Sequence, residues 1–375
     1  MEMIARGTRR GLVGRAAGGM RPASRMATRT PRRPRALPTF REYLTNSENS
    51  PKTGLGLVLH TVSEACIEIA SEVDLAPIRA AAMAQAGKGS TATSSSSSSR
   101  NASGDEQKEL DLVANEILIS RLRECPSVAI GASEENDEII QMSEGTAGAE
   151  GKSYAVVFDP LDGSRNVECN IPVGSIFGVY EHDEALGVLR PGRDLVAAGY
   201  VLYSSSCLLV LTRGDGVDGF TLDREAGEFV LTHPDLRVRE RGQIYSVNDA
   251  RYWDWPQGLR DFIDAIRRGE GTGGGGQYSA RYVCSLVADV HRTLLYGGVA
   301  MNPRSHLRLL YEGFPMAFVM EQAGGKGVNG KTNLLDMTPS GLHQKTPVFV
   351  GSSGDIAELL SYGDVVQTST KTYSV

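Results

Sequence analysis

Cysteine is scarce in this sequence, and its arrangement signals neither a metal site nor a redox site. The 375 residues include five cysteines, which are widely scattered: Cys66, Cys125, Cys169, Cys207 and Cys284. No two of them form a Cys-x-x-Cys pair, which excludes the usual zinc and thioredoxin-like patterns. Five is also an odd number and argues against a fully paired disulfide framework. We therefore expect most of the cysteines to be small buried hydrophobic residues.

Long apolar runs are missing as well. No stretch approaches the apolar length that is needed to cross a bilayer, so we expect no membrane-spanning role and no membrane partner. The composition, 41% hydrophobic and 22% charged, is ordinary for a globular protein. A chain of this length can form one large domain or two ordinary ones with a sizeable core.

Acidic residues are nearly absent from residues 1–38, which hold ten arginines and one acid, Glu2. This segment resembles an organellar transit peptide and lacks the central apolar run of a secretory signal. The alternative is a basic arm for nucleic acid, but nothing downstream resembles a nucleic-acid module. Without the segment, Lys+Arg falls from 39 to 29 and Asp+Glu from 45 to 44, so the net charge moves from −6 to −15. Such an acidic body does not favour nucleic acid as a partner.

The rest of the chain mixes helical and strand patterns without strict alternation. Apolar periodicity predicts helices over 57–73, 74–86, from 111 onward, and over 259–268, 284–296 and 315–322. Short apolar runs predict strands over 128–130, 154–158, 175–180, 197–203, 208–212 and 307–311. A serine-rich segment, 87–104, cannot bury a core and is predicted to be a mobile loop. We expect a layered α/β fold with two halves, 39–214 and 215–375.

The most informative stretch runs from Phe158 to Asn166 and reads Phe-Asp-Pro-Leu-Asp-Gly-Ser-Arg-Asn. It follows a short apolar strand and carries two carboxylates three residues apart. The small residues that follow them offer free backbone N–H groups to a phosphate where a helix could begin. Carboxylates for a hard cation beside amides for an anion suit metal-assisted phosphate chemistry. The alternative is an ordinary acidic loop after a strand.

Other acids could converge on this stretch. Glu134 and Glu135 follow another predicted strand, and Glu312 lies near the start of a helix. Asp105 and Asp111 lie just past the serine-rich segment. Each of these alone is more often a solvated surface acid, so the chemistry depends on whether they meet.

Taken together, these motifs resemble the fructose-1,6-bisphosphatase family, and in particular the second plastid form of plants and algae. The resemblance covers roughly residues 55–364. The segments that carry it are Asn101–Asp111, Ser133–Glu135, Asp159–Ser164, Leu189–Tyr200, Ala280–Arg292 and Leu307–Met316. It implies a sugar-phosphatase fold, layered α/β/α/β/α, with the active site between two halves. It also implies hydrolysis of the 1-phosphate of fructose 1,6-bisphosphate.

The resemblance further implies two or three magnesium ions in each subunit. Their ligands would be the side chains of Glu134, Asp159, Asp162 and Glu312 and the carbonyl of Leu161. Asp111 and Glu135 would polarise the attacking water, and Asp105 would support a further ion. Magnesium prefers such oxygen ligands to nitrogen and sulfur.

The implied sugar-phosphate site lies in several segments. Gly163 and Ser164 would hold the phosphate being removed. The other phosphate and the sugar would be held by Asn248, Tyr252, Arg281, Tyr282, His306 and Arg308. Arg281 would reach across from a neighbouring subunit, which implies a homotetramer or homodimer.

Three positions depart from the family pattern. Asn302 and His306 stand where the family usually has Tyr and Lys, and Arg304 or His306 is the candidate replacement. Arg165 replaces a serine and adds a cation near the scissile phosphate. These departures leave two alternatives open: a sedoheptulose-1,7-bisphosphatase, and a catalytically weak sensor of sugar phosphates.

The transit-like segment and the resemblance together predict a location in the plastid stroma. The redox-controlled plastid enzyme carries a cysteine-bearing insertion before its Asp-Pro-Leu-Asp strand, whereas residues 145–153 contain no cysteine here. We therefore expect no thioredoxin switch of that kind. The nucleotide site of cytosolic relatives is poorly matched around residues 52–57, so we do not expect inhibition by AMP.

Overall fold

The computed structural model describes residues 37–45, 54–85, 109–142, 152–271 and 276–368. The predictions for the arginine-rich segment, the serine-rich segment and Asp105 fall almost entirely outside the described residues, and so do most of residues 145–153. They stay predictions.

The first sheet has eight strands in the order β2-β1-β3-β4-β5-β6-β7-β8. Their bounds are β1 (Val128–Ser133), β2 (Ile140–Gln141), β3 (Tyr154–Asp162), β4 (Val173–Glu181), β5 (Leu195–Tyr203), β6 (Cys207–Thr212), β7 (Asp218–Asp223) and β8 (Glu228–His233). β1 and β3 pair in parallel, and the other pairs are antiparallel. Every residue of β3 is buried, as a strand that is covered on both faces requires. The predicted boundary between residues 214 and 215 stays a prediction, although this sheet continues to His233.

The second sheet has five strands in the order β10-β9-β11-β13-β12. Their bounds are β9 (Ile244–Ser246), β10 (Ser279–Ala280), β11 (Val299–Arg308), β12 (Lys326–Val328) and β13 (Lys345–Gly351).

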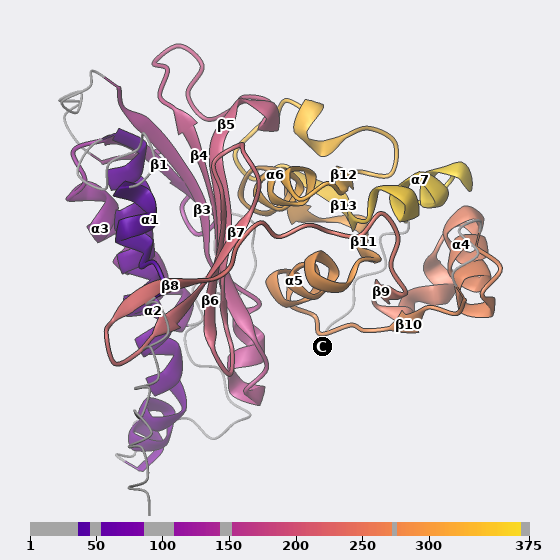
Figure 1. Cartoon of the computed structure of the whole chain (residues 1–375), viewed down its shortest axis with the longest axis horizontal. Helices are drawn as coiled ribbons and strands as arrows, with labels where there is room; N and C mark the ends of the chain where they lie inside the picture. The colour runs from indigo at the N-terminus through magenta and orange to yellow at the C-terminus, as the bar shows by residue number, and fades with distance from the viewer. Residues whose placement is uncertain (1–36, 46–53, 86–108, 143–151, 272–275, 369–375) are drawn as a thin grey trace, which may run out of the picture. The chain divides into compact units, whose positions relative to one another are not determined.

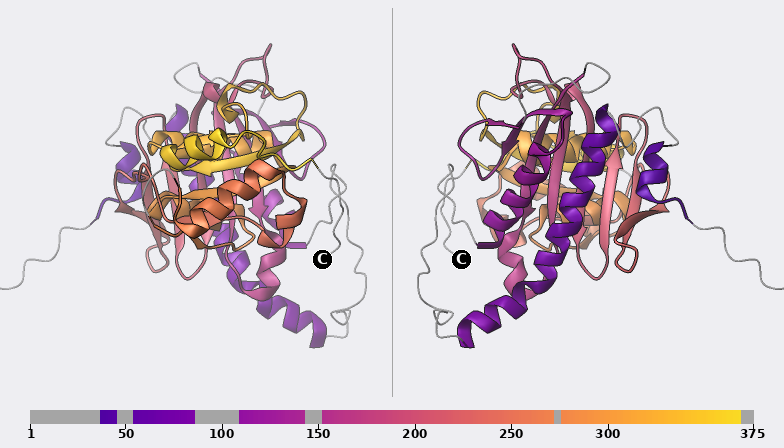
Figure 2. Two further views of the ribbon diagram at one scale, coloured as in Figure 1. Left: turned by 90° about the vertical axis from the view of Figure 1, so that its right-hand side faces the viewer. Right: turned by 90° about the vertical axis from the view of Figure 1, so that its left-hand side faces the viewer.

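Helices cover both sheets in layers (Figures 1 and 2). α1 (Phe40–Thr45), α2 (Gly54–Gln85) and α3 (Glu109–Arg123) lie on the outer face of the first sheet. α5 (Leu286–Tyr296) and α6 (Phe314–Gln322) lie between the sheets, and α4 (Gln257–Arg268) and α7 (Ser353–Ser361) cover the second sheet. The described residues also form five short helices: η1 (Ser164–Cys169), η2 (Gly192–Asp194), η3 (Asp249–Asp254), η4 (Leu309–Gly313) and η5 (Leu334–Asp336). This is the predicted α/β/α/β/α arrangement.

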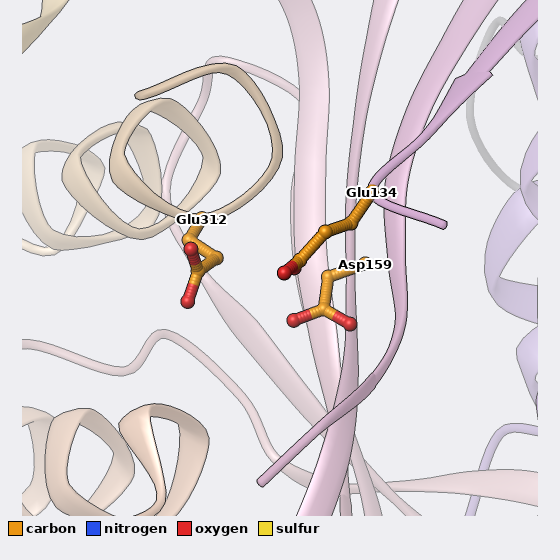
Figure 3. Close-up of side chains that lie close together, drawn as sticks. All are labelled: Glu134, Asp159 and Glu312. Carbon is orange, nitrogen blue, oxygen red and sulfur yellow. The ribbon is translucent and has the colours of Figure 1, made fainter. Parts of the chain in front are cut away.

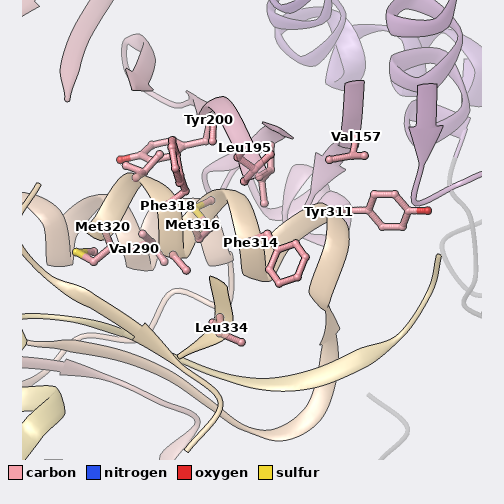
Figure 4. Packing of buried hydrophobic residues seen from close by; sticks show 14 of the residues in the cluster. Val157, Leu195, Tyr200, Val290, Tyr311, Phe314, Met316, Phe318, Met320 and Leu334 are labelled. Carbon is pink, nitrogen blue, oxygen red and sulfur yellow. The ribbon is translucent and has the colours of Figure 1, made fainter. Parts of the chain in front are cut away.

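Three apolar clusters hold the layers together, one on the outer face of each sheet and one between the sheets. The middle cluster surrounds α6, whose first seven residues are all buried (Figure 4). A helix that is apolar on all sides belongs in a core, because no side of it is left for water. The start of α6 is thereby fixed between the two sheets.

Most predicted elements are confirmed, and four of them needed correction. The strand that was predicted to end at Phe158 continues to Asp162. The two helices predicted over 57–73 and 74–86 are one helix, α2, with Pro77 inside it. Only the first two residues of the strand predicted over 307–311 are extended, and the rest form a short π-helix, η4.

We expected no stretch long and apolar enough to cross a bilayer, and this expectation was wrong for one helix. By length and composition alone, residues Gly54–Ala82 of α2 could cross a membrane, with a mean hydropathy of 1.2. However, 61% of this window is buried inside the protein, and the core helix of a globular protein passes the same test. The cysteines behave as expected: all five are free, and Cys66, Cys125 and Cys207 are buried.

The middle layer offers a direct test of this packing. Leu294 of α5 is 1% exposed, whereas Leu186 is 56% exposed. Leu294→Ala is expected to lower the free energy of unfolding by about 2–5 kcal/mol, because it removes buried methyl groups and leaves a cavity. Leu186→Ala, the matched control, should change it by about 0.5 kcal/mol or less. Urea denaturation measures both, and equal losses would contradict this account of the core.

Candidate active site

A cavity of about 970 Å³ lies between elements of the two sheets. One wall comes from β1, β3, α3 and η1, and the other from η3, β11 and the turn before α5. Most of the predicted site residues line it: Asp111, Glu134, Glu135, Asp159, Leu161, Asp162, Gly163, Ser164, Asn248, Tyr282, His306, Arg308 and Glu312. Two do not line it, Tyr252 and Arg281, and Asp105 lies outside the described residues.

The parallel pairing of β1 with β3 brings the first two acids together. Ser133 lies opposite Phe158 in the register, and the N–H of Glu134 donates to the carbonyl of Phe158 at 3.1 Å. Because the two strands run in the same direction, the residues that follow this pair lie next to each other at the same edge of the sheet. Those residues are Glu134 and Asp159.

A bulge in β3 shapes the segment that follows. The register with β4 shifts between Asp159 and Asp162, and Pro160 lies at this irregularity, where the missing N–H costs no ladder hydrogen bond. The N–H of Leu161 donates to Asp159 Oδ1 at 3.0 Å, and the hydroxyl of Ser175 donates to the Pro160 carbonyl at 2.7 Å. Both acids of the motif are therefore held by a rigid, buried backbone.

The third acid, Glu312, comes from the other half of the chain. It lies in η4, the π-helix between β11 and α6, and accepts a hydrogen bond from the N–H of Arg308. Carboxylate oxygens of Glu134, Asp159 and Glu312 lie within 4.8 Å of one another (Figure 3). Ligand oxygens around one hard divalent ion have separations of this size, since each lies about 2.0–2.6 Å from the ion.

We call Glu134, Asp159 and Glu312 the acid cluster. The electrostatics of the acid cluster also suit a cation. Burial raises the pKa of Glu134 to about 7, although the Arg308 guanidinium lies 3.0 Å away, and Glu135 adds repulsion. Burial, followed by repulsion from neighbouring carboxylates, raises the pKa of Asp159 and of Glu312 well above their usual ranges. Buried carboxylates of this kind need a positive partner to stay ionised. The donor set, oxygen only, therefore fits a hard divalent cation.

Asp162 lies beside the acid cluster rather than within it. Its Oδ2 accepts hydrogen bonds from the hydroxyl of Ser285, at 3.1 Å, and from the N–H of Val287, at 3.0 Å, at the start of α5. Burial raises the pKa of Asp162 to about 6, and these hydrogen bonds oppose the rise. Its carboxylate thus joins the first sheet to the middle layer.

The turn after β3 is tied to both neighbouring layers. Gly163 has a φ of 75°, a conformation that glycine adopts without strain. The hydroxyl of Ser164 donates to Asp111 Oδ2 at 3.1 Å, and the side chain of Asn166 donates to the Cys284 carbonyl at 3.0 Å. The small residues that we predicted for phosphate binding therefore face the cavity next to Asp111.

The opposite wall carries cations. Between Asn302 and Leu307 the register of β11 with β13 shifts, because four residues of β11 lie opposite one residue of β13. Arg304 and His306 belong to this bulge, and both line the cavity. Arg251 of η3 lines it too, and desolvation, followed by the charge of Arg304, lowers the pKa of Arg251.

The structure places two predicted substrate residues elsewhere. The hydroxyl of Tyr252 donates to Asp264 at 2.7 Å, outside the cavity, and Arg251 next to it takes the place in the wall. Arg281 lines a second cavity of about 470 Å³. Its expected role in a neighbouring subunit stays a prediction. Arg251 was missed because neither its spacing nor its neighbours indicate which side of η3 faces inward.

Comparison with known proteins decides the family. A sequence model described as "Fructose-1-6-bisphosphatase, N-terminal domain" matches residues 43–234, and one described as "Fructose-1-6-bisphosphatase, C-terminal domain" matches residues 238–364. The chain belongs to the fructose-1,6-bisphosphatase family. Because these proteins are phosphatases, the chain is a hydrolase of phosphate esters. The plastid form suggested by the sequence stays a prediction.

Relatives and solved structures agree with this assignment. Cytosolic fructose-1,6-bisphosphatases of Brassica napus and Spinacia oleracea are each 44% identical over 270 residues, which cover 69% of this chain and 78% and 77% of theirs. The crystal structure of Leishmania major fructose-1,6-bisphosphatase in holo form matches with a TM-score of 0.76 and 36% identity. It covers 88% of this chain and 100% of that one. The fold class is confirmed, and the family implies a divalent metal cofactor.

The acid cluster predicts opposite effects of one substitution with and without a cation. Without a cation, Glu312→Gln is expected to raise the melting temperature, because it removes one of three mutually repelling buried carboxylates. The Mg²⁺ concentration that gives half of the metal-induced shift should rise more than about tenfold, since even residues that only hydrogen bond to the ligands of a metal contribute about 10–100-fold to its affinity. Thermal denaturation in chelator and in a Mg²⁺ series measures both quantities.

A second buried glutamate serves as the control for that substitution. Glu358 is paired with Arg241 away from the acid cluster. Glu358→Gln should lower the melting temperature, because it removes the charge of one of the two carboxylates that pair with that arginine, Glu358 and Asp355, and should leave the Mg²⁺ dependence unchanged. If Glu312→Gln responded to Mg²⁺ as Glu358→Gln does, Glu312 would not be a ligand.

Proposed function

We propose that this family member hydrolyses the 1-phosphate of fructose 1,6-bisphosphate to fructose 6-phosphate and phosphate, with Mg²⁺ as the cofactor. The observation that supports this is the composition of one cavity, which is lined by a cluster of buried carboxylates and, opposite the first sheet, by Arg251 and Arg304. A bisphosphate needs both walls, because one phosphate is attacked while the other anchors the molecule. A monophosphate would need only the first.

Two or three Mg²⁺ ions would be held by the carboxylates of Glu134, Asp159, Asp162 and Glu312 and by the Leu161 carbonyl. When bound, they supply positive charge to the oxygens of the scissile phosphate and lower the pKa of water. Arg308 keeps Glu134 in place through its ion pair.

The protein's own groups position the reactants. The backbone N–H groups around Gly163 and the hydroxyl of Ser164 bind the phosphate that is removed. Asp111 and Glu135, which both line the cavity, orient the attacking water and accept its proton. Ser164 already donates a hydrogen bond to Asp111, so the position of the phosphate site is fixed relative to that of the water site. Asp105 is proposed to support a further ion.

The phosphate that is not removed, the distal phosphate, binds to the cavity wall that carries Arg251 and Arg304. Asn248, Tyr282 and His306 line it together with Arg251 and Arg304. A planar guanidinium suits bidentate recognition of phosphate. The bulge in β11 thus supplies the charge that the family's usual lysine supplies elsewhere.

Phosphate release from two sugars tests the function. The purified chain is expected to release phosphate from fructose 1,6-bisphosphate in Mg²⁺ and to lose this activity in chelator, because the acid cluster alone cannot neutralise the scissile phosphate. A higher kcat/KM on sedoheptulose 1,7-bisphosphate would favour the sedoheptulose enzyme instead. Binding of either sugar without phosphate release would favour the sensor.

Arg304 gives a test of the distal phosphate site. Arg304→Ala is expected to raise the KM for fructose 1,6-bisphosphate about tenfold or more and to change kcat little, since a charged hydrogen bond contributes about 1.5–3 kcal/mol and 1.4 kcal/mol is tenfold. The effect should vanish on fructose 1-phosphate, which lacks the distal phosphate. Arg237, whose ion pair with Asp235 lies outside the cavity, is the control. Equal losses of kcat/KM on both sugars would refute the assignment.

The proposed setting is the plastid stroma, and the proposed assembly is a homotetramer or homodimer. The arginine-rich, acid-poor residues 1–38 support the location. The relatives described above are named cytosolic, so the location rests on this segment alone. Arg281 is exposed and lines the second cavity rather than its own active site, which supports a role toward a neighbouring subunit.

A further inference from the structure

Three polar side chains form a continuous hydrogen-bonded path behind the acid cluster. The hydroxyl of Ser133 donates to Asn115 Oδ1 at 2.7 Å, and the amide of Asn115 donates to Asn136 Oδ1 at 2.9 Å. Ser133 also accepts a hydrogen bond from the N–H of Glu135 at 3.2 Å. We call Asn115, Ser133 and Asn136 the polar bridge. It joins α3 to the end of β1, and none of its members lines the cavity.

The polar bridge is deeply placed. Ser133 is 0% exposed and Asn115 is 8% exposed. Burying such groups costs free energy unless each is hydrogen bonded, and apolar residues would pack there without that cost. A fully satisfied buried polar network makes its surroundings rigid and specifies one geometry. The cost of burying the bridge therefore indicates that it holds neighbouring residues in a defined position.

Two members of the bridge, Asn115 and Ser133, adjoin the two acids proposed to handle water. Asp111 lies four residues before Asn115 on α3, so both side chains share one face of the helix. Glu135 is bound to the bridge directly through its N–H. The two acids come from different elements, a helix and a strand end, and the bridge connects those elements beside them.

We infer that Asn115, Ser133 and Asn136 are positioning residues that set the separation of Asp111 and Glu135 around the attacking water. The inference rests on the proposed hydrolysis. A misplacement of about 1 Å can lower a rate about 100-fold when reacting groups must be aligned. Because the bridge does not line the cavity, substrate affinity does not depend on it. Its loss should therefore lower kcat and leave KM nearly unchanged.

Ser133→Ala is the first test, because it removes the hydroxyl that hydrogen bonds to both Asn115 and the N–H of Glu135. We expect kcat for fructose 1,6-bisphosphate to fall at least tenfold, with KM and the half-saturating Mg²⁺ concentration within about threefold of the unmodified chain. Thr212→Val is the matched control. Thr212 is 1% exposed, ends strand β6 and accepts a hydrogen bond from the N–H two residues later at 3.1 Å, as Ser133 does. Its loss should leave kcat unchanged.

A second pair of variants keeps the test decisive if Ser133→Ala does not fold. Asn136 is half-buried, so substitution there should be tolerated. Asn136→Ala removes the acceptor for Asn115 and should lower kcat, whereas Asn136→Asp retains an acceptor oxygen and should restore most of it. Circular dichroism and thermal denaturation check the fold of each variant.

The outcomes separate the two proposals. If the unmodified chain releases no phosphate, the proposed function fails and the positioning role fails with it. If the unmodified chain is active but Ser133→Ala and Asn136→Ala keep its kcat, only the positioning role is refuted. A rise in KM without a fall in kcat would also refute it, because the bridge would then act on substrate binding.

Discussion

Parallel pairing of β1 with β3 is the constraint on which the candidate active site depends. With Ser133 opposite Phe158, the residues that follow this pair, Glu134 and Asp159, lie at one edge of the sheet, and the cavity opens there. An antiparallel partner would send the two chain ends to opposite edges and separate these acids. The other pairs of this sheet are antiparallel in the described part of the chain, so this edge is the natural place for two strand ends to meet. The bulge in β3, the polar bridge and the buried start of α6 all act to keep that meeting point rigid.

The cavity separates two kinds of charge by the elements that carry them. The first sheet, α3 and η4 supply the proposed carboxylate ligands and water-binding acids, while η3 and the bulge of β11 supply Arg251 and Arg304, and Arg165 of η1 adds a further guanidinium group. Placing the acids in the interior is unfavourable for their ionised forms, as the raised pKa values of Glu134, Asp159 and Glu312 show. Such a site suits a cation and a polyanion together. The cation neutralises the carboxylates, and the polyanion neutralises the guanidinium groups.

The sequence allowed the acids and most of the first sheet to be predicted, and it failed where neighbours in space decide the outcome. Short apolar runs, such as residues 175–180 within β4, are read directly from the chain. Which residue of η3 faces the cavity, Arg251 or Tyr252, depends on how that short helix packs against α4, where Asp264 binds the tyrosine. The bulge that turns Arg304 inward depends on the partner strand β13. Asn115 and Ser133 look ordinary in sequence, because their role appears only when α3 lies against β1.

Glu312 enters the acid cluster from the far end of the polypeptide, at the junction of β11 and α6. The three carboxylates are therefore separated by nearly two hundred residues of chain, although they lie within a few ångströms in space. During synthesis the ribosome releases Glu134 and Asp159 long before Glu312. A nascent chain can thus fold its first sheet early, but it gains the complete set of carboxylates only after β11 and η4 have also been synthesised.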